Sequence, residues 1–206
     1  MLPVLLGSAT RFSERLHAAS KVYAALVLFG HETTTDDAEG AVRHEAPVPD
    51  LDRGALDEVL GGFRGEIMQA PPAFSAVKIA GRRAYRAARA GEDLHLAPRP
   101  VRVERLEVAP WRPPALRLLI VCGSGTYVRS LARDIGRACG SAAHLGALRR
   151  LAVGSLTVDE AVDPGSIRAA GASISERLRP ADDRLIALDD RYRTAPAEEL
   201  LDTWQN

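Results

Sequence analysis

The residues best suited to chemistry lie in one short stretch, Gly123-Ser-Gly-Thr-Tyr-Val-Arg129. It follows an apolar segment, residues 116–122, that predicts a strand, and it leads into residues 126–139, whose periodicity predicts a helix. Such a strand-turn-helix junction exposes backbone N–H groups and the first side chains of the helix. Because Tyr127 can stack on a nucleobase and Arg129 can hold a carboxylate through two parallel hydrogen bonds, they form a candidate substrate-facing pair.

Two other interpretations of this stretch stay open on pattern alone. A dinucleotide-binding loop of GxGxxG type would need a third glycine, where Val128 stands, and an acidic residue closing the next strand, which the sequence lacks. A purely structural turn, with Tyr127 packed in the core, is the interpretation that the pattern itself favours.

Three further segments could contribute to a site. Lys21-Val-Tyr23 opens an apolar run, and a tyrosine in such a strand usually belongs to the core. Residues 30–40 hold three consecutive threonines and Asp37, but they lack the D-x-[DN]-x-[DN]-G spacing of a calcium loop, so a solvated turn is predicted. Residues 69–78 are rich in proline and predict a loop.

The remaining patterns predict the elements that must position these residues. Strands are expected at 21–29, at 101–108 with a bulge, and at 116–122, and helices at 10–17, 52–63, 82–90, 126–139 and 142–148. Because strands do not alternate with long helices, we expect an α+β fold with a mixed, mainly antiparallel sheet flanked by helices. Residues 1–162 would form the core, and residues 163–206 an appendage or an incomplete C-terminal module.

Composition excludes several classes of protein. The longest apolar runs, such as residues 24–29 and 118–122, are too short to span a bilayer. Cys122 and Cys139 fit neither a disulfide framework nor a CxxC site, and the five histidines are scattered, so no metal is expected. The cysteine usage is typical of a reducing, cytoplasmic compartment. We also expect a monomer without a cofactor.

The charge distribution favours a polyanionic partner although the formal net charge is zero. Residues 69–150 hold 15 basic and 5 acidic residues, whereas residues 31–68 hold 3 basic and 10 acidic ones. A basic middle segment can present a local positive surface to phosphates. The alternative, arginines spread over solvated faces, is not excluded by pattern.

Taken in order, these segments resemble the TruB family of tRNA pseudouridine synthases, over residues 1 to about 154. Residues 2–10 resemble the stretch that follows the family signature GTLDPxATG, and residues 21–23 resemble its Tyr-bearing strand. Residues 30–40 resemble G-x-x-T-x-T-x-D-x-x-G, residues 69–78 resemble Q-x-P-P-x-[FY]-S-A-x-K, and residues 123–129 contain G-T-Y-[IV]-R. Residues 144–151 resemble the helix that ends in L-R-R.

The resemblance implies a pseudouridine-synthase fold and the isomerisation of one T-arm uridine, position 55 of tRNA, without metal or cofactor. It implies that Tyr23 stacks on the everted base, that Tyr127 bounds the pocket, and that Arg129 pairs with the catalytic carboxylate. Leu148 would line the apolar wall beside the base. Lys21 and Asp37 would complete the substrate-binding residues, and the T arm of tRNA would be the partner.

The nucleophilic aspartate of the family belongs to the GTLDPxATG segment, which would end just before Met1. We therefore expect the given chain to be inactive by itself, and apolar surface to be exposed near Leu2–Leu6. The alternative is a non-catalytic RNA-binding protein of the same fold, which would bind tRNA in a salt-dependent manner without turnover.

Overall fold

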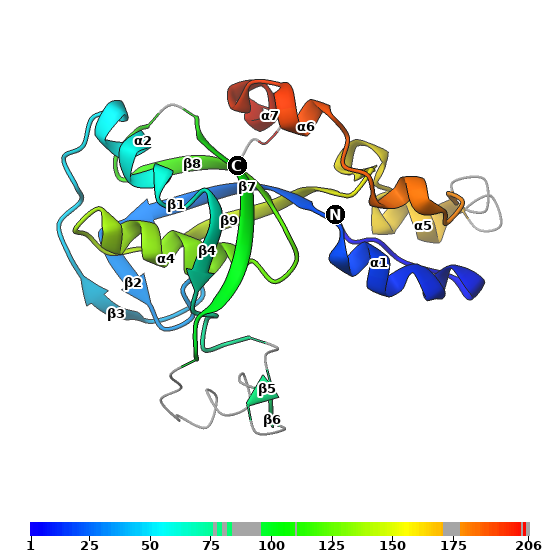
Figure 1. Cartoon of the computed structure of the whole chain (residues 1–206), viewed down its shortest axis with the longest axis horizontal. Coiled ribbons are helices and arrows are strands. Elements are labelled where there is room, and N and C mark those ends of the chain that lie inside the picture. Colours follow the sequence, from blue (N-terminus) through cyan, green and yellow to red (C-terminus); the bar gives the residue numbers. More distant parts are fainter. Residues whose placement is uncertain are drawn as a thin grey trace.

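The computed structural model describes residues 1–75, 78–79, 82–83, 96–109, 111–170, 178–202 and 204. Its centre is a six-stranded antiparallel sheet in the order β10-β9-β1-β8-β7-β4 (Figure 1). The strands of this sheet are β1 (Lys21–Phe29), β4 (Gly65–Gln69), β7 (Arg99–Val108), β8 (Ala115–Cys122), β9 (Ala143–Val153) and β10 (Leu156–Thr157). The expected α+β fold with a mainly antiparallel sheet is confirmed.

Two small hairpins and several short helices surround the sheet. The hairpins pair β2 (His31–Thr33) with β3 (Val42–Glu45), and β5 (Lys78–Ile79) with β6 (Arg82–Arg83). The helices are η1 (Gly7–Phe12), α1 (Ser13–Ala18), α2 (Arg53–Gly61), α4 (Val128–Ala138), η2 (Val158–Glu160), α5 (Pro164–Ala170), η4 (Asp183–Ile186), α6 (Arg191–Thr194) and α7 (Ala197–Asp202). Among the described residues, none of these helices has the length and apolar character needed to cross a membrane.

Strand β1 lies in the middle of the sheet and is buried on both faces. Ala25, Val27 and Phe29 pack into the core under α4, whereas Val22 and Ala24 pack into a second core on the opposite face. Burial on both faces explains why this strand is an almost continuous apolar run rather than an alternating one.

The C-terminal residues cover the face of the sheet opposite α4. Leu188, Tyr192, Ala197, Leu201 and Trp204 complete the second core with side chains of β1, β8 and β9. An arginine of β8 also donates hydrogen bonds to the main-chain carbonyls of Leu201 and Trp204, at 2.6 and 3.1 Å. Described residues between 188 and 204 thus share a core with the sheet, and the division at residue 162 stays a prediction.

The helix predicted over residues 142–148 is wrong, because residues 143–153 form β9. This strand pairs with β1 in a long antiparallel register that runs from Phe29–Ala143 to Lys21–Val153. Alanine and leucine favour helices locally, but pairing along β1 overrides that weak preference. The bulge predicted within residues 101–108 is confirmed by the register shift between Val103 and Arg105.

The helix predicted over residues 82–90 falls mostly outside the described residues, and Arg82–Arg83 form strand β6 instead. The helices predicted at 52–63 and 126–139 are confirmed as α2 and α4. The one predicted at 10–17 is divided between η1 and α1.

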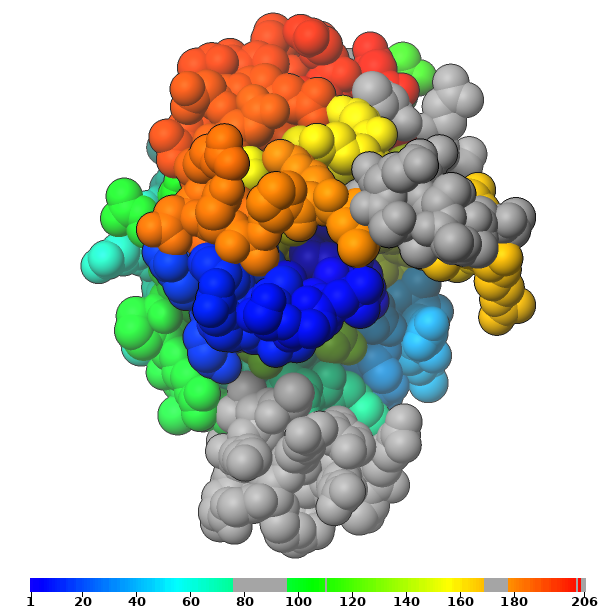
Figure 2. Space-filling model, turned by 90° about the vertical axis from the view of Figure 1, so that its right-hand side faces the viewer, coloured from blue at the N-terminus to red at the C-terminus, as the bar shows by residue number. Residues whose placement is uncertain are grey.

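The N-terminal segment Met1–Leu6 runs along the side of the molecule, next to the residues that follow position 178 (Figure 2). Together they line an apolar groove of about 700 Å³. The side chains of Leu2 and Val4 are 76% and 72% exposed, so the expected apolar surface near Leu2–Leu6 is confirmed.

Candidate functional site

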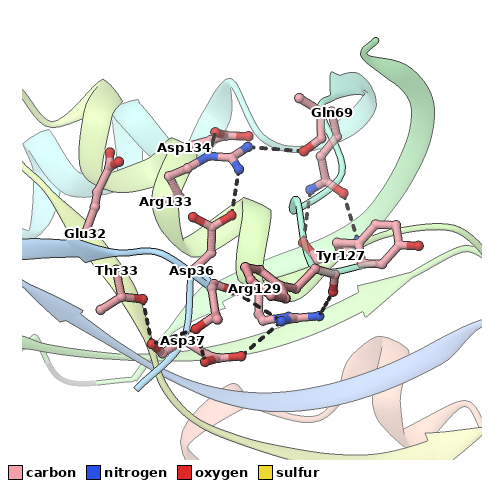
Figure 3. Close-up of polar contacts among 12 residues, drawn as sticks. Glu32, Thr33, Asp36, Asp37, Gln69, Tyr127, Arg129, Arg133 and Asp134 are labelled. Carbon is pink, nitrogen blue, oxygen red and sulfur yellow. Dashed lines mark hydrogen bonds and ion pairs between the residues drawn. The ribbon is translucent and has the colours of Figure 1, made fainter. Parts of the chain in front are cut away.

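Helix α4 begins at the candidate pair, and its first turn is fixed by a buried glutamine. Tyr127 precedes the helix, and its carbonyl accepts the first helical hydrogen bond, from Leu131 N at 3.0 Å. The side chain of Gln69, the last residue of β4, forms two hydrogen bonds with the main chain of Tyr127 (Figure 3). Its Oε1 accepts from Tyr127 N at 2.8 Å, and its Nε2 donates to Tyr127 O at 3.2 Å. Strand β4 therefore sets where α4 starts.

The guanidinium of Arg129 joins three segments that are far apart in the sequence. Its Nη1 donates to Asp37 Oδ2 at 3.0 Å and to Thr35 O at 3.2 Å, and its Nη2 donates to Phe74 O at 2.9 Å. The structure thus brings residues 30–40, 69–75 and 123–129 together around one cation (Figure 3).

The loop that carries Asp37 is held against β9. Ala38 N donates to Leu145 O, and Leu145 N donates to Asp36 O, both at 3.0 Å. The Asp37 carboxylate also accepts from Thr35 Oγ1 at 2.5 Å. A Cβ atom on Gly40 would lie 2.5 Å from Thr35 Oγ1 and 2.7 Å from its main-chain nitrogen, so this tight loop requires glycine there.

Two more arginines of α4 bind acids of the same loop region. Arg133 donates to Asp36 Oδ2 at 2.7 Å, and Arg137 donates to the two carboxylate oxygens of Glu32 at 2.5 and 2.7 Å. Arg43 of β3 adds a further bond to Glu32 at 2.7 Å. The common helix face of these arginines follows from their spacing in the sequence, whereas their acidic partners do not.

Burial and charge act against each other at these acids. Burial by itself would raise the pKa of Glu32, but hydrogen bonds from Arg137 and Arg43 overcome it and hold the pKa at about 2. At Asp36 burial dominates and raises the pKa, although the charges of Arg133 and Arg43 oppose that change. The network is therefore a rigid support for the loop rather than a set of freely titrating groups.

Tyr23 and Leu148 lie on the α4 side of the sheet, next to the site. Tyr23 is half-buried and packs against the core that includes Val128 at the start of α4. Its cross-strand neighbour on β9 is Arg150, and Leu148 pairs with Ala25 on the same face. Leu148 is 45% exposed, and burial raises the pKa of the Tyr23 phenol.

The predicted site residues therefore form two groups on one side of the sheet. Tyr127, Arg129 and Asp37 belong to the hydrogen-bonded network, and Lys21, Tyr23 and Leu148 lie on β1 and β9 beside it. In the described part of the chain, neither Lys21 nor Tyr23 hydrogen-bonds to Arg129.

The roles of Gln69, Asp36 and Arg133 were not predicted from the sequence. The motif that begins at Gln69 was a signal for the role of this residue. A glutamine side chain at the end of a strand, before two prolines, can hydrogen-bond with main-chain groups that lack a partner. The acids of residues 32–37 were a signal for the others, because buried arginines need partners. Within the described ranges, no group of three or more His, Cys, Asp or Glu side chains could hold a metal ion.

The sequence matches two family models and several curated proteins. Residues 1–128 match the N-terminal domain of the "TruB family pseudouridylate synthase", and residues 129–201 match the "tRNA pseudouridylate synthase B C-terminal domain". A "tRNA pseudouridine synthase B" of Cupriavidus pinatubonensis is 43% identical over 203 residues, which are 97% of this chain and 62% of the relative. That of Chromobacterium violaceum is 46% identical over 160 residues, 78% of this chain and 52% of the relative.

The solved structure of a Cbf5-Nop10-Gar1 complex is also similar, with a TM-score of 0.56 and 30% identity over 78% of this chain and 38% of that one. The chain spans less than two thirds of the length of the curated relatives from Cupriavidus and Chromobacterium. The match to the N-terminal family domain covers more than half of the chain. The chain therefore belongs to the TruB family of pseudouridylate synthases.

Proposed function

We propose that this chain forms the catalytic core of a tRNA pseudouridine synthase that isomerises a uridine of the T arm, at position 55 of tRNA. The observation that supports it best is the convergence of residues 30–40, 69–75 and 123–129 on Arg129, beside a sheet face that carries Tyr23. An arginine held this firmly can orient a carboxylate through its guanidinium. The aromatic ring of Tyr23, beside this arginine, can stack against a base.

The reaction needs a pocket rather than a redox group. The N-glycosidic bond breaks, the base turns, and a bond forms between the sugar and C5 of the base, which gives up its hydrogen as a proton. The target base must first leave the folded RNA, at a cost of a few kcal/mol. Stacking on Tyr23 would return about 1–3 kcal/mol of this cost.

Each site residue has a part in this proposal. Arg129 keeps the catalytic carboxylate ionised and oriented, and Asp37 keeps Arg129 in place through the 3.0 Å ion pair. Tyr127 bounds the pocket at the start of α4, and Leu148 offers its half-exposed apolar side chain to the base. Lys21 contacts the substrate from β1.

The prediction that the nucleophilic aspartate comes from a GTLDPxATG segment is tested by adding that segment in frame before Met1. Release of tritium from tRNA labelled at C5 of uridine measures turnover directly, because only the isomerisation frees that hydrogen. We expect no release by the chain itself and release by the extended chain. R129K in the extended chain should lose most of the activity, since lysine cannot make the bidentate contact.

Turnover by the chain without the added segment would refute the prediction of inactivity. Salt-dependent tRNA binding without turnover in the extended chain would favour the non-catalytic RNA-binding alternative. Absence of tRNA binding would contradict both. The monomeric state and the cytoplasmic location stay predictions.

A further inference from the structure

Among the described residues, two cations beside Tyr23, Lys21 and Arg150, have no acidic partner. Lys21 stands two residues before Tyr23 on β1, and Arg150 is the cross-strand neighbour of Tyr23 on β9, so all three belong to one face of the sheet. Lys21 Nζ donates to His17 O. Arg150 Nε and Nη2 both donate to Met1 O, at 3.0 and 2.9 Å. These acceptors are neutral carbonyls, and the Tyr23 phenol, which also hydrogen-bonds with Arg150, is neutral as well, so no carboxylate of the described residues compensates either charge.

The arginines of the neighbouring network differ from Lys21 and Arg150 because they have acidic partners. The arginines of α4 at positions 129, 133 and 137 each form an ion pair with a carboxylate of residues 32–37. In the part of the chain that the structure describes, neither Lys21 nor Arg150 forms an ion pair. Lys21 and Arg150 therefore place positive charge without an acidic partner, in the described part of the chain, beside the predicted stacking ring.

The surroundings favour an anion there. Burial lowers the pKa of Lys21, and the positive charge of Arg150 lowers it further. The thiol of Cys122 faces Lys21 across β1 and β8, but burial raises the pKa of that thiol to about 12, so it supplies no negative charge at neutral pH. A bound anion would offset the free-energy cost of desolvating the two cations and would reduce their mutual repulsion.

We propose that Lys21 and Arg150 form a phosphate site, which holds a backbone phosphodiester next to the base that stacks on Tyr23. The inference rests on the proposed function, since it takes RNA as the ligand. An everted nucleotide carries its own flanking phosphates, so a base on Tyr23 brings one of them close to side chains on the same sheet face. Arginine and lysine are the residues that most often hold RNA and DNA phosphates, and such contacts fix the register of the nucleic acid.

The strand provides a matched control for this site. Arg149 is adjacent in sequence and carries the same charge, but it pairs with Ala24, whose side chain belongs to the core on the opposite face. R149Q and R150Q therefore remove the same charge from opposite sides of the same strand. K21Q tests the second cation.

The experiment measures binding of a fluorescent T-arm RNA hairpin by anisotropy over a range of salt concentrations, with an unrelated hairpin for comparison. We expect R150Q to weaken binding about tenfold or more, because a charge-assisted hydrogen bond is lost. It should also reduce the slope of log K against log salt by about one. R149Q should bind within about twofold of the parent chain. K21Q should act in the same direction as R150Q.

A second RNA, with a neutral methylphosphonate at the target nucleotide, locates the contact. The parent chain should bind it more weakly than the natural RNA, and R150Q should show a clearly smaller difference between the two RNAs, because only Lys21 then remains to contact the phosphate. Equal effects of R149Q and R150Q, or an equal methylphosphonate penalty in the parent and R150Q, would overturn the phosphate site while leaving the proposed function standing. No preference of the parent chain for the T-arm hairpin would overturn both.

Discussion

Replacing Asp36 by asparagine should destabilise the protein strongly, because it removes one charge from a buried ion pair. The side chains of Asp36 and Arg133 are 5% and 9% exposed, and their closest atoms are 2.7 Å apart. Asparagine keeps the shape of the side chain and tolerates the positive φ of 60° at this position. The substitution thus changes the charge and little else.

The expected loss of stability in D36N depends on the hydrogen bonds that Arg133 retains. Removing one partner of a buried pair typically costs about 3–5 kcal/mol, because the other charge stays buried without compensation. Arg133 retains its bonds to Asp134 at 2.9 Å and to Ala70 O at 3.1 Å, so we expect the lower end, about 3 kcal/mol. For a chain of 206 residues this corresponds to a fall in Tm of about 6–12 °C.

Differential scanning calorimetry of D36N measures this shift, and D190N is the matched control. Asp190 pairs with Arg193 at 3.7 Å, but the two side chains are 88% and 55% exposed, so its loss should cost less than about 1 kcal/mol. The double variant D36N/R133M removes both buried charges and should recover part of the loss. A Tm of D36N equal to that of D190N, or a double variant no more stable than D36N, would refute the reasoning.

Three further predictions concern acid stability, thiol reactivity and helix packing. The depressed pKa of Glu32 means that its ion pairs stabilise the fold above pH 4.5 and are lost as the pH falls toward about 2; E32Q should flatten the acid limb of a plot of Tm against pH, and an unchanged limb would contradict this. Cys139 is partly exposed and Cys122 is buried with a pKa of about 12, so alkylation followed by mass spectrometry should label Cys139 first in the native protein, and early labelling of Cys122 would show that its strand opens. A Cβ atom on Gly136 of α4 would lie 2.6 Å from Ala143, so G136A should lower the free energy of unfolding by about 1–3 kcal/mol. G61A in α2 meets nothing within 4 Å and should be neutral or stabilising by up to about 1 kcal/mol; equal effects of the two glycine substitutions in urea titrations would argue against the close contact.

The sequence by itself determined the elements whose patterns are local. The apolar run of residues 21–29 predicts a buried strand, and the spacing of the arginines within residues 126–139 places them on one face of the predicted helix. The resemblance to the TruB family implied that the motif segments meet at one site. The family resemblance, which the comparisons confirm, came from the order of those segments.

Tertiary structure decided what depends on partners distant in sequence. A helix is predicted locally over residues 142–148, but residues 143–153 form a strand because β1 offers backbone partners along its whole length. Arg133 and Asp36 are 97 residues apart, and no local rule pairs them; their contact requires the loop after β2 to dock on β9. Likewise the pairing of Arg150 with Tyr23 is set by the register of β9, which a bulge between Val22 and Tyr23 shifts by one residue. Side-chain neighbours of this kind follow from long-range packing, so they emerge only when the chain is folded.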